Sequence, residues 1–448
     1  MRLFSKKSIG LLLAAVMVLS VVVSSYIPAA EAAAPARNVI LLIGDGMGYG
    51  QMTLGRIMKD SALTMDSFTF NGTASTYPND PVEKWVTDSA AAGTALATGV
   101  KTYNAAISVD VNKKPVKTIL EYAQENGKAT GLVTTTRITH ATPAVFASHN
   151  ADRDAENEIA VDMLNHKVDV LLGGGKRYFV TKDQGGKRED GRDLIAEAKN
   201  MGYTFVETRD DMNKVTGGKL LGLFKSSHAS YDIDRDAAKE PSLAEMTKKA
   251  IDILSKDKEG FFLMVEGGRI DHASHGHDAA TVAKDVIAFD DAVKVALDFA
   301  KSRKDTLVIV TADHETGGLS IGGYGQYNFK PEVLKAQKNS IEDVIASKFT
   351  ADNYKDIFAQ YFGITDLTPY EQVAMLDAFK AQKTDSYAVA NTAADIMSKR
   401  ALVGWTSGGH TGTDVPVMAY GPNASDFARH MDNTDINRLM MKAFGFSR

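Results

Sequence analysis

Side chains suited to metal chemistry gather in a few short stretches of this sequence. One stretch of twelve residues contains Glu266, Asp271, His272, His275 and His277. Any one of these histidines alone would more often be a packed structural residue, but five such side chains together are hard to explain as a solvated surface. Imidazole combined with carboxylate favours zinc, whereas sites made only of oxygen atoms favour magnesium. This stretch therefore predicts a metal centre.

Three further stretches carry the same kinds of side chain. Asp45 lies in a glycine turn, where an aspartate alone is more often a cap than a ligand. Asp313 and His314 are adjacent, and His410 lies in a turn of small residues. Each stretch adjoins an apolar run typical of a buried strand, and open α/β sheets place ligands just beyond the ends of their strands. We therefore expect these stretches to contribute to metal binding.

Ser89 is the candidate nucleophile. It follows Asp88 and begins a run of small residues that favours a helix with the serine at its N-terminus. Backbone N–H groups and the helix dipole there would attract a phosphate. The alternative is that Ser89 is only an N-cap residue, a common role for serine. Because the sequence contains no G-x-S-x-G, we expect a bound metal, rather than a triad, to activate the hydroxyl.

A candidate phosphate-binding arginine follows a polar segment. The segment 139–143 contains His140 and Thr142, and Arg153 lies ten residues beyond it. A guanidinium group matches two phosphate oxygens and stays charged at any working pH. Arg153 is therefore a candidate for holding substrate.

These side chains need alternating strands and helices to position them. Apolar runs rich in β-branched residues are found at 38–43, 130–134, 168–172, 261–265, 306–311 and 415–419, and helical periodicity is found at 116–126, 155–166, 243–256 and 280–302. Runs this apolar suit strands that are buried on both faces. The predicted fold class is α/β, a layered helix–sheet–helix domain with a large, mostly parallel central sheet. Residues 324–399 are helix-rich and predict an insertion, a cap or an oligomer contact, or else ordinary surface helices.

The first residues predict a secretory signal peptide. Three basic side chains precede an apolar run at 9–23, and residues 30–32 offer a small-x-small cleavage site. The run is short for a membrane span of about 20 residues, and no later segment approaches that length. We expect removal of residues 1–32, a single catalytic domain at 33–448, and a secreted protein that is extracellular or associated with the cell wall. An uncleaved membrane anchor is the alternative.

Composition excludes several classes of function. The chain has no cysteine, which rules out disulfides, a cysteine nucleophile and a lipid anchor on cysteine. Its formal net charge is −5 and no basic stripe stands out, so no nucleic-acid-specific surface is expected.

Taken together, these stretches resemble the alkaline phosphatase family. The motifs are V-T-D-S-A-A-A-G-T-A-x-A-T-G around Ser89, E-G-G-R-I-D-H-A-S-H at 266–275, T-A-D-H at 311–314 and G-G-H-T at 408–411. They follow the family's order from Asp45 to His410. The resemblance implies hydrolysis of small phosphate monoesters to alcohol and inorganic phosphate through a phosphoserine intermediate. It also implies the family's fold, inhibition by inorganic phosphate, and a monomer or homodimer.

The resemblance further implies a role for each candidate residue, with two zinc ions and one magnesium ion as cofactors. The first zinc would be bound by Asp271, His275 and His410, the second by Asp45, Asp313 and His314 beside Ser89, and magnesium by Asp45, Thr142 and Glu266. Arg153 fits the arginine that clamps the substrate, and Arg137 is a nearby competitor.

Two positions differ from the enteric members of the family. Histidines stand at 140 and 272, where the enteric enzymes carry an aspartate and a lysine. His140 offers at most one acceptor to the waters around magnesium, so we expect magnesium to bind weakly or to be replaceable, for example by cobalt. His272 could reach the substrate phosphate directly or through water. The alternative is that both histidines only pack near the site.

Two kinds of rival function remain open at this point. A phosphodiesterase, phosphomutase or sulfatase of the same superfamily would keep the fold, although Ser89 lacks the C/S-x-P-x-R context of a sulfatase. A non-catalytic phosphate- or metal-binding protein could use the same ligands. It would bind phosphate without releasing alcohol.

Overall fold

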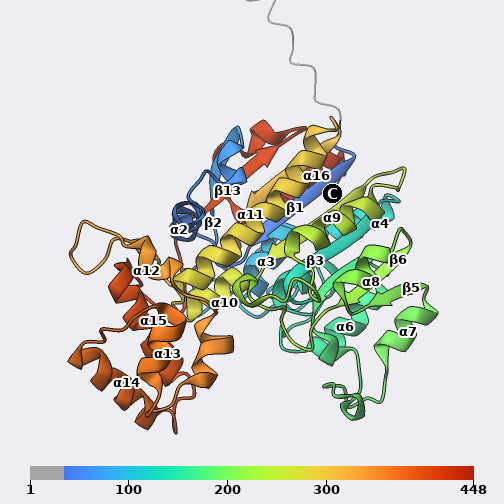
Figure 1. Ribbon diagram of the computed structural model, residues 1–448. Coiled ribbons are helices and arrows are strands. Elements are labelled where there is room, and N and C mark those ends of the chain that lie inside the picture. The colour runs from blue at the N-terminus through green and yellow to red at the C-terminus, as the bar shows by residue number, and fades with distance from the viewer. Residues whose placement is uncertain (1–34, 448) are drawn as a thin grey trace, which may run out of the picture. The chain divides into compact units, whose positions relative to one another are not determined.

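The computed structural model describes residues 35–447, so the predicted signal peptide lies outside the described residues. Ten strands form the central sheet: β1 (Asn38–Gly44), β2 (Phe70–Ser75), β3 (Ala129–Arg137), β4 (Val170–Gly174), β5 (Tyr203–Val206), β6 (Lys219–Leu223), β7 (Phe261–Gly267), β8 (Thr306–Thr311), β13 (Val415–Tyr420) and β14 (His430–Asp432). Their order across the sheet is β14-β2-β13-β8-β1-β7-β3-β4-β6-β5 (Figure 1).

The sheet is mostly parallel, which confirms the predicted fold class. β1 pairs in parallel with both β7 and β8 at its centre. β13 is the exception, because it runs antiparallel to both of its neighbours, β8 and β2. All six predicted strands are present. The unpredicted strands include β2, in which one of six residues is buried, and the four-residue β5, which is too short to give a clear apolar pattern.

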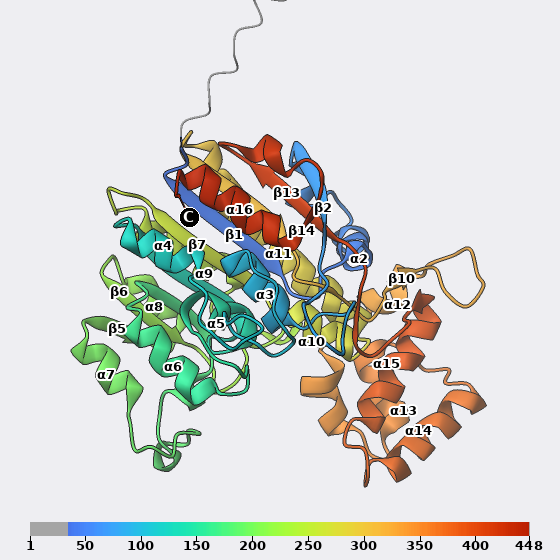
Figure 2. The ribbon, with the colours of Figure 1, turned by 180° about the vertical axis from the view of Figure 1, so that it is seen from behind.

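Helices cover both faces of the sheet. One face carries α2 (Tyr49–Lys59), α9 (Leu243–Leu254) and α11 (Ala279–Lys301), and the other carries α3 (Ser89–Thr98), α4 (Ile119–Glu125), α5 (Ala141–Ala147) and α16 (Asn433–Phe444) (Figures 1 and 2). Near the β4–β5 end lie α6 (Glu156–Asn165), α7 (Leu194–Asn200) and α8 (Arg209–Lys214). The short α10 (Arg269–His275) follows β7.

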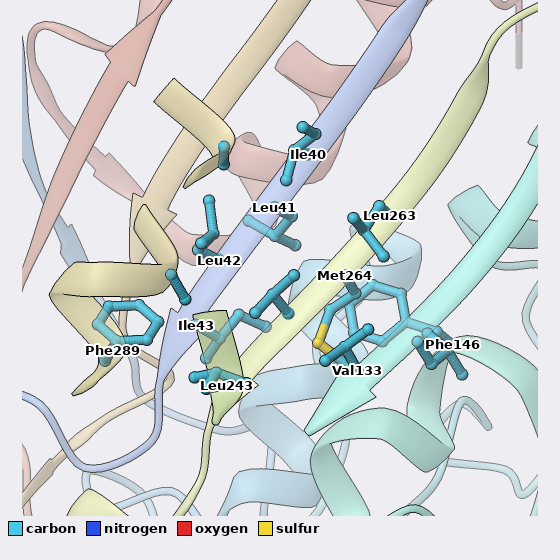
Figure 3. Packing of buried hydrophobic residues seen from close by; sticks show 14 of the residues in the cluster. Ile40, Leu41, Leu42, Ile43, Val133, Phe146, Leu243, Leu263, Met264 and Phe289 are labelled. Carbon is cyan, nitrogen blue, oxygen red and sulfur yellow. The ribbon is translucent and has the colours of Figure 1, made fainter. Parts of the chain in front are cut away.

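The main core lies between the sheet and these two helical layers. Every residue of β1 and β7 is buried, as expected for central parallel strands. Phe289 of α11 and Phe146 of α5 pack against the sheet from helices on opposite faces (Figure 3). The apolar strands thereby form a rigid support whose ends can hold polar groups.

A helical segment lies between two short strands, β10 (Ser320–Ile321) and β11 (Val403–Gly404), which pair with each other. Its helices include α12 (Pro331–Lys335), α13 (Tyr354–Ile357), α14 (Pro369–Ala381) and α15 (Ala388–Ala401). Most of its buried apolar residues form a cluster of their own, whereas Leu334 and Ala401 belong to the main core. That this segment is a cap or an oligomer contact stays a prediction. Within residues 35–447, no helix has both the length and the apolar character that crossing a bilayer requires.

Candidate active site

The carboxyl ends of three central strands deliver metal-binding side chains to one edge of the sheet. Asp45 follows β1, Glu266 lies near the end of β7, and His314 follows β8. Because β13 is antiparallel, the segment that precedes it begins at the same edge, and this segment carries His410. Stretches that are far apart in the sequence therefore meet in one place.

The first predicted ligand group is brought together. His275 Nε2 lies 3.1 Å from His410 Nε2 and 3.3 Å from Asp271 Oδ2. His275 Nδ1 donates to the Gly408 carbonyl at 2.7 Å, and His410 Nδ1 donates to the Thr87 carbonyl at 2.8 Å. Each ring, when neutral, therefore keeps its lone pair on Nε2. Two lone pairs this close repel each other unless a proton or a metal ion lies between them.

A proton satisfies this group in the metal-free protein. Burial opposes it, but the hydrogen bond and the attraction to Asp271 raise the pKa of His275 to about 9. A metal ion at this position must therefore compete with that proton.

The second predicted group is also brought together. His314 Nε2 lies 3.6 Å from Asp45 Oδ1 and 3.3 Å from Asp313 Oδ2. Ser89 Oγ lies 3.2 Å from the same Nε2. The Thr316 hydroxyl donates to Asp271 and can therefore accept from His314 Nδ1 at 3.3 Å, which leaves the lone pair on Nε2 to act as a ligand atom.

Unpaired carboxylate oxygens mark this second group as incomplete by itself. Asp45 Oδ1 and Asp313 Oδ2 are buried and make no hydrogen bond within the described part of the chain. Burial, followed by repulsion from neighbouring carboxylates, raises the pKa of both groups. A bound cation would offset this cost.

A third group surrounds Glu266. Thr142 Oγ1 donates to Asp45 Oδ2 at 3.3 Å, and Glu266 Oε1 is buried without a hydrogen bond among residues 35–447. His140 borders this group, because its ligand atom and those of Asp45 and Glu266 lie within 4.8 Å of one another. Burial and the charge of Arg153 hold the pKa of His140 well below its usual value, so the ring is neutral.

Ser89 occupies the first helical position of α3. Its neighbour Asp88 is the N-cap and accepts a hydrogen bond from Ala91 N at 2.9 Å, so Ser89 is not the N-cap residue. The Asp88 carboxylate also accepts from Arg153 Nη1 at 2.9 Å. Arg153 Nη2 lies 3.2 Å from His140 Nε2. One aspartate therefore positions both the serine helix and the arginine.

Arg137, the alternative candidate for binding the substrate phosphate, contacts other residues than Arg153 does. Its guanidinium pairs with the buried carboxylate of Glu156 at 2.7 Å. It also contacts His228, a residue that the sequence did not single out. His228 follows β6, an unpredicted strand, so the rule that ligands follow strand ends could have found it only if β6 had been recognised.

His272 lies beside the contact between Arg137 and His228. Its ring centroid is 4.4 Å from that of His228, and its Nδ1 lies 3.1 Å from Arg269 Nη1. Burial and the charge of Arg269 lower the pKa of His272 to about 3, so the ring is neutral. Since Nδ1 accepts from the guanidinium, Nε2 carries the hydrogen and can donate it.

A cavity of about 540 Å³ opens beside these histidines. His272 and His275 line one side, and Glu342 and Tyr387 of the helical segment line another. The space beside the candidate metal ligands is therefore shaped partly by the 324–399 region.

Comparisons with known proteins agree with this geometry. The family model for alkaline phosphatase matches residues 36–446. Alkaline phosphatase 3 of Bacillus subtilis (strain 168) is 44% identical over 100% of this chain and 99% of its own length. Alkaline phosphatase 4 of the same organism is 42% identical over 91% of this chain and 89% of its own.

Solved structures give the same result. The cold-active alkaline phosphatase from the psychrophile Shewanella sp. superposes with a TM-score of 0.82 at 36% identity, over 91% of this chain and 99% of that one. A histidine-to-aspartate variant of the TAB5 alkaline phosphatase, with magnesium bound in its M3 site, has a TM-score of 0.69 at 31% identity over 93% of this chain and 100% of that one. Because the family model and these relatives span almost the whole described chain, the chain belongs to the alkaline phosphatase family and is a phosphoric monoester hydrolase.

Proposed function

We propose that this phosphatase transfers the phosphoryl group of a small monoester first to Ser89 and then to water, at a site for two zinc ions and one magnesium ion. The observation that carries the proposal is the convergence of imidazole Nε2 atoms and unpaired carboxylate oxygens around the Ser89 hydroxyl. When bound, the zinc ions would supply the positive charge that favours the ionised hydroxyl and the departing oxygen.

The donor atoms of the first two groups fit zinc. Their contacts of 3.1–3.6 Å bracket the edge of about 3.3 Å in a tetrahedron with zinc–ligand distances of about 2.0–2.1 Å. We assign Asp271, His275 and His410 to one zinc ion. The second assignment is Asp45, Asp313 and His314.

The protein's own groups would perform the transfer as follows. Ser89 Oγ attacks phosphorus in line, the bond from phosphorus to the substrate oxygen breaks, and the alcohol leaves. Water then cleaves the phosphoserine and restores the serine. Arg153 would hold two phosphoryl oxygens through its planar fork, and the N-terminus of α3 adds a favourable dipole.

The third group fits magnesium less well. Asp45, Thr142 and Glu266 offer oxygen atoms, which magnesium prefers. His140 accepts from Arg153 through Nε2, so its Nδ1 carries a hydrogen and offers a donor where magnesium-bound water needs an acceptor. We therefore propose a weakly held magnesium ion, consistent with a relative in which aspartate replaces a histidine and magnesium is bound. His272 is proposed to donate from Nε2 to the substrate phosphate, directly or through water.

Metal analysis combined with paired substrates tests this function. We expect at least two zinc ions per chain, and hydrolysis of nitrophenyl phosphate to exceed that of the matching diester and sulfate by several orders of magnitude. Full activity in a preparation free of zinc would contradict the metal assignment. A diester rate equal to the monoester rate would contradict the substrate assignment.

We also propose that residues 1–32 are a signal peptide, that 33–448 form one catalytic domain, and that the enzyme is secreted. The basic, apolar and Ala-x-Ala order of the first residues supports this, and the family match begins at residue 36. N-terminal sequencing of enzyme from culture medium should start within about two residues of position 33. Enzyme that keeps Met1 and stays with the membrane would disprove it.

A further inference from the structure

A second group of metal-competent side chains lies outside the active site. Glu121 of α4, His149 in the loop after α5, and His166 at the C-terminal end of α6 place ligand atoms within 4.8 Å of one another. Glu121 Oε1 lies 3.2 Å from His149 Nε2 and 3.9 Å from His166 Nδ1. The side chains are 17–25% exposed, so an ion and a water molecule from solvent can reach them.

The hydrogen bonds of His149 leave this group unsatisfied. His149 Nδ1 lies 2.8 Å from the Ser108 carbonyl, which can only accept, so Nδ1 carries the hydrogen. In the neutral ring, Nε2 then points its lone pair at the Glu121 carboxylate. Two acceptors cannot face each other at this distance without a cation. Either a second proton on His149 or a metal ion must lie there.

The Glu121 carboxylate and the backbone of His166 are held in place independently of any ion. Glu121 Oε2 accepts from Thr118 N at 2.7 Å as part of the capping box of α4, which leaves Oε1 turned toward the histidines. The His166 carbonyl accepts from Gln124 Nε2 at 2.7 Å, and its backbone N–H donates to Asp162. The Glu121 carboxylate and the backbone that carries His166 are therefore positioned before binding, which lowers the cost of binding an ion.

We propose that Glu121, His149 and His166 bind a divalent transition-metal ion of the zinc class, with solvent water completing a tetrahedron. The two contacts to Oε1, at 3.2 and 3.9 Å, bracket the tetrahedral edge of about 3.3 Å. A histidine N–H bonded to a carbonyl is the usual outer contact of a metal-bound imidazole. A second proton on His149 would account for its contact with Glu121. It would not explain why His166 also lies near the same carboxylate.

Such an ion would cross-link three segments on the face of the sheet that carries α5. It would join α4 to α6 and fix the loop at His149, four residues before Arg153. An ion that binds only the native state raises the thermal midpoint, and the increase grows with the free ion concentration relative to the dissociation constant. The site is therefore expected to stabilise the enzyme without touching the substrate.

The test uses full-length, metal-loaded enzyme and two single variants. His166→Gln removes one ligand and leaves the Glu121–His149 pair. His430→Gln changes an exposed histidine elsewhere and serves as the matched control. Each protein is dialysed against buffered zinc, its zinc content is measured by mass spectrometry, and its thermal midpoint is recorded as zinc is added.

We expect wild type and His430→Gln to hold one more zinc ion per chain than His166→Gln, with the same kcat on nitrophenyl phosphate in all three. The rise in thermal midpoint that accompanies occupancy of this last site should be lost in His166→Gln alone. Equal zinc content and equal zinc response in wild type and His166→Gln would overturn the proposal. The active-site assignment is unaffected by either result, because the zinc count at the catalytic group is common to all three proteins.

Discussion

Ser89 lies among the candidate metal ligands, with its hydroxyl 3.2 Å from His314 Nε2. Ser89→Ala removes the proposed nucleophile while leaving those groups in place, so we expect kcat to fall by at least about 10³-fold. The variant should also form no acid-stable phosphoenzyme. Labelling with phosphate at low pH, followed by peptide mapping, measures this directly. Ser302→Ala, at an exposed position, should label and turn over as wild type does, and label on any residue other than Ser89 would refute the assignment.

Arg153 and Arg137 have different contacts, so their replacement should have different effects. Arg153→Ala removes the proposed phosphate clamp, and since a charge-assisted hydrogen bond contributes about 1.5–3 kcal/mol, kcat/KM should fall about 10–100-fold. Arg137→Ala should leave kcat/KM within a few-fold of wild type but destabilise the fold by about 3 kcal/mol, because it leaves the buried Glu156 unpaired. Steady-state kinetics and thermal unfolding of both variants decide the matter. The opposite pattern would assign the clamp to Arg137.

At the scale of single residues, the sequence predicts which side chains form the site better than it predicts the backbone groups that orient them. Strand ends and family motifs indicate Asp45, Asp313 and His410, all of which lie at the same edge of the sheet. The carbonyls of Thr87 and Gly408, which set the tautomers of two histidines, could not be predicted. They act through the backbone, which is the same for every residue type, and only the folded chain shows which carbonyl faces a ring.

The start of α5 adjoins the third candidate metal group. His140 is its N-cap and makes no capping hydrogen bond through its side chain. His140→Asp would place acceptor oxygens and a negative charge there, so magnesium should bind more tightly and activate at lower concentration. Titrating magnesium into metal-depleted enzyme, with zinc saturating, measures the shift.

His140→Asn is the matched control for this change. Asparagine caps a helix about as well as aspartate and has nearly the same shape, but it carries no charge. We therefore expect His140→Asn to leave the activation curve near that of wild type. If the aspartate and wild-type curves coincide, His140 does not tune this site.

At the scale of elements, periodicity predicts that a strand exists but not which way it runs. The apolar run at 415–419 predicts a buried strand, and β13 is one. Its antiparallel direction follows from neighbours that are distant in the sequence. That direction brings His410 to the edge of the sheet where the other candidate ligands lie. β2 gives little signal because only one of its six residues is buried. Strands whose pairing depends on tertiary contacts are those that a local pattern misses.

Over the whole molecule, we expect the buried carboxylates to make stability depend on metal content. A chelator should abolish activity and lower the thermal midpoint, since an ion at a thousandfold excess over its dissociation constant stabilises the native state by about 4 kcal/mol. Added zinc should restore both properties. An apoprotein that melts at the same temperature as the loaded enzyme would show that the metal groups do not contribute to stability.

The same carboxylates give the metal-free protein a defined response to pH. Asp45 and Asp313 have raised pKa values in the folded state, so their contribution is fully present below the unfolded pKa of about 4 and is lost as pH rises through the folded values. His275 acts in the same direction, between its unfolded pKa of about 6.5 and its folded value of about 9. Thermal midpoints of chelated protein should therefore fall from pH 6 to pH 9 by more than those of the zinc-loaded enzyme. A parallel decline in the two forms would contradict this.

The paired strands β10 and β11 have a consequence for how such an enzyme can change over evolutionary time. Ser320 pairs with Gly404 and Ile321 with Val403, so the helical segment leaves the body of the enzyme and returns to it at adjacent points. A segment with neighbouring ends and its own apolar cluster can be lengthened, shortened or exchanged by recombination while the catalytic edge keeps its register. Glu342 and Tyr387 belong to this exchangeable part and line the cavity beside His275. We therefore expect descendants of one ancestral phosphatase to differ in this module, and in the cavity that it lines, while the candidate metal ligands stay the same.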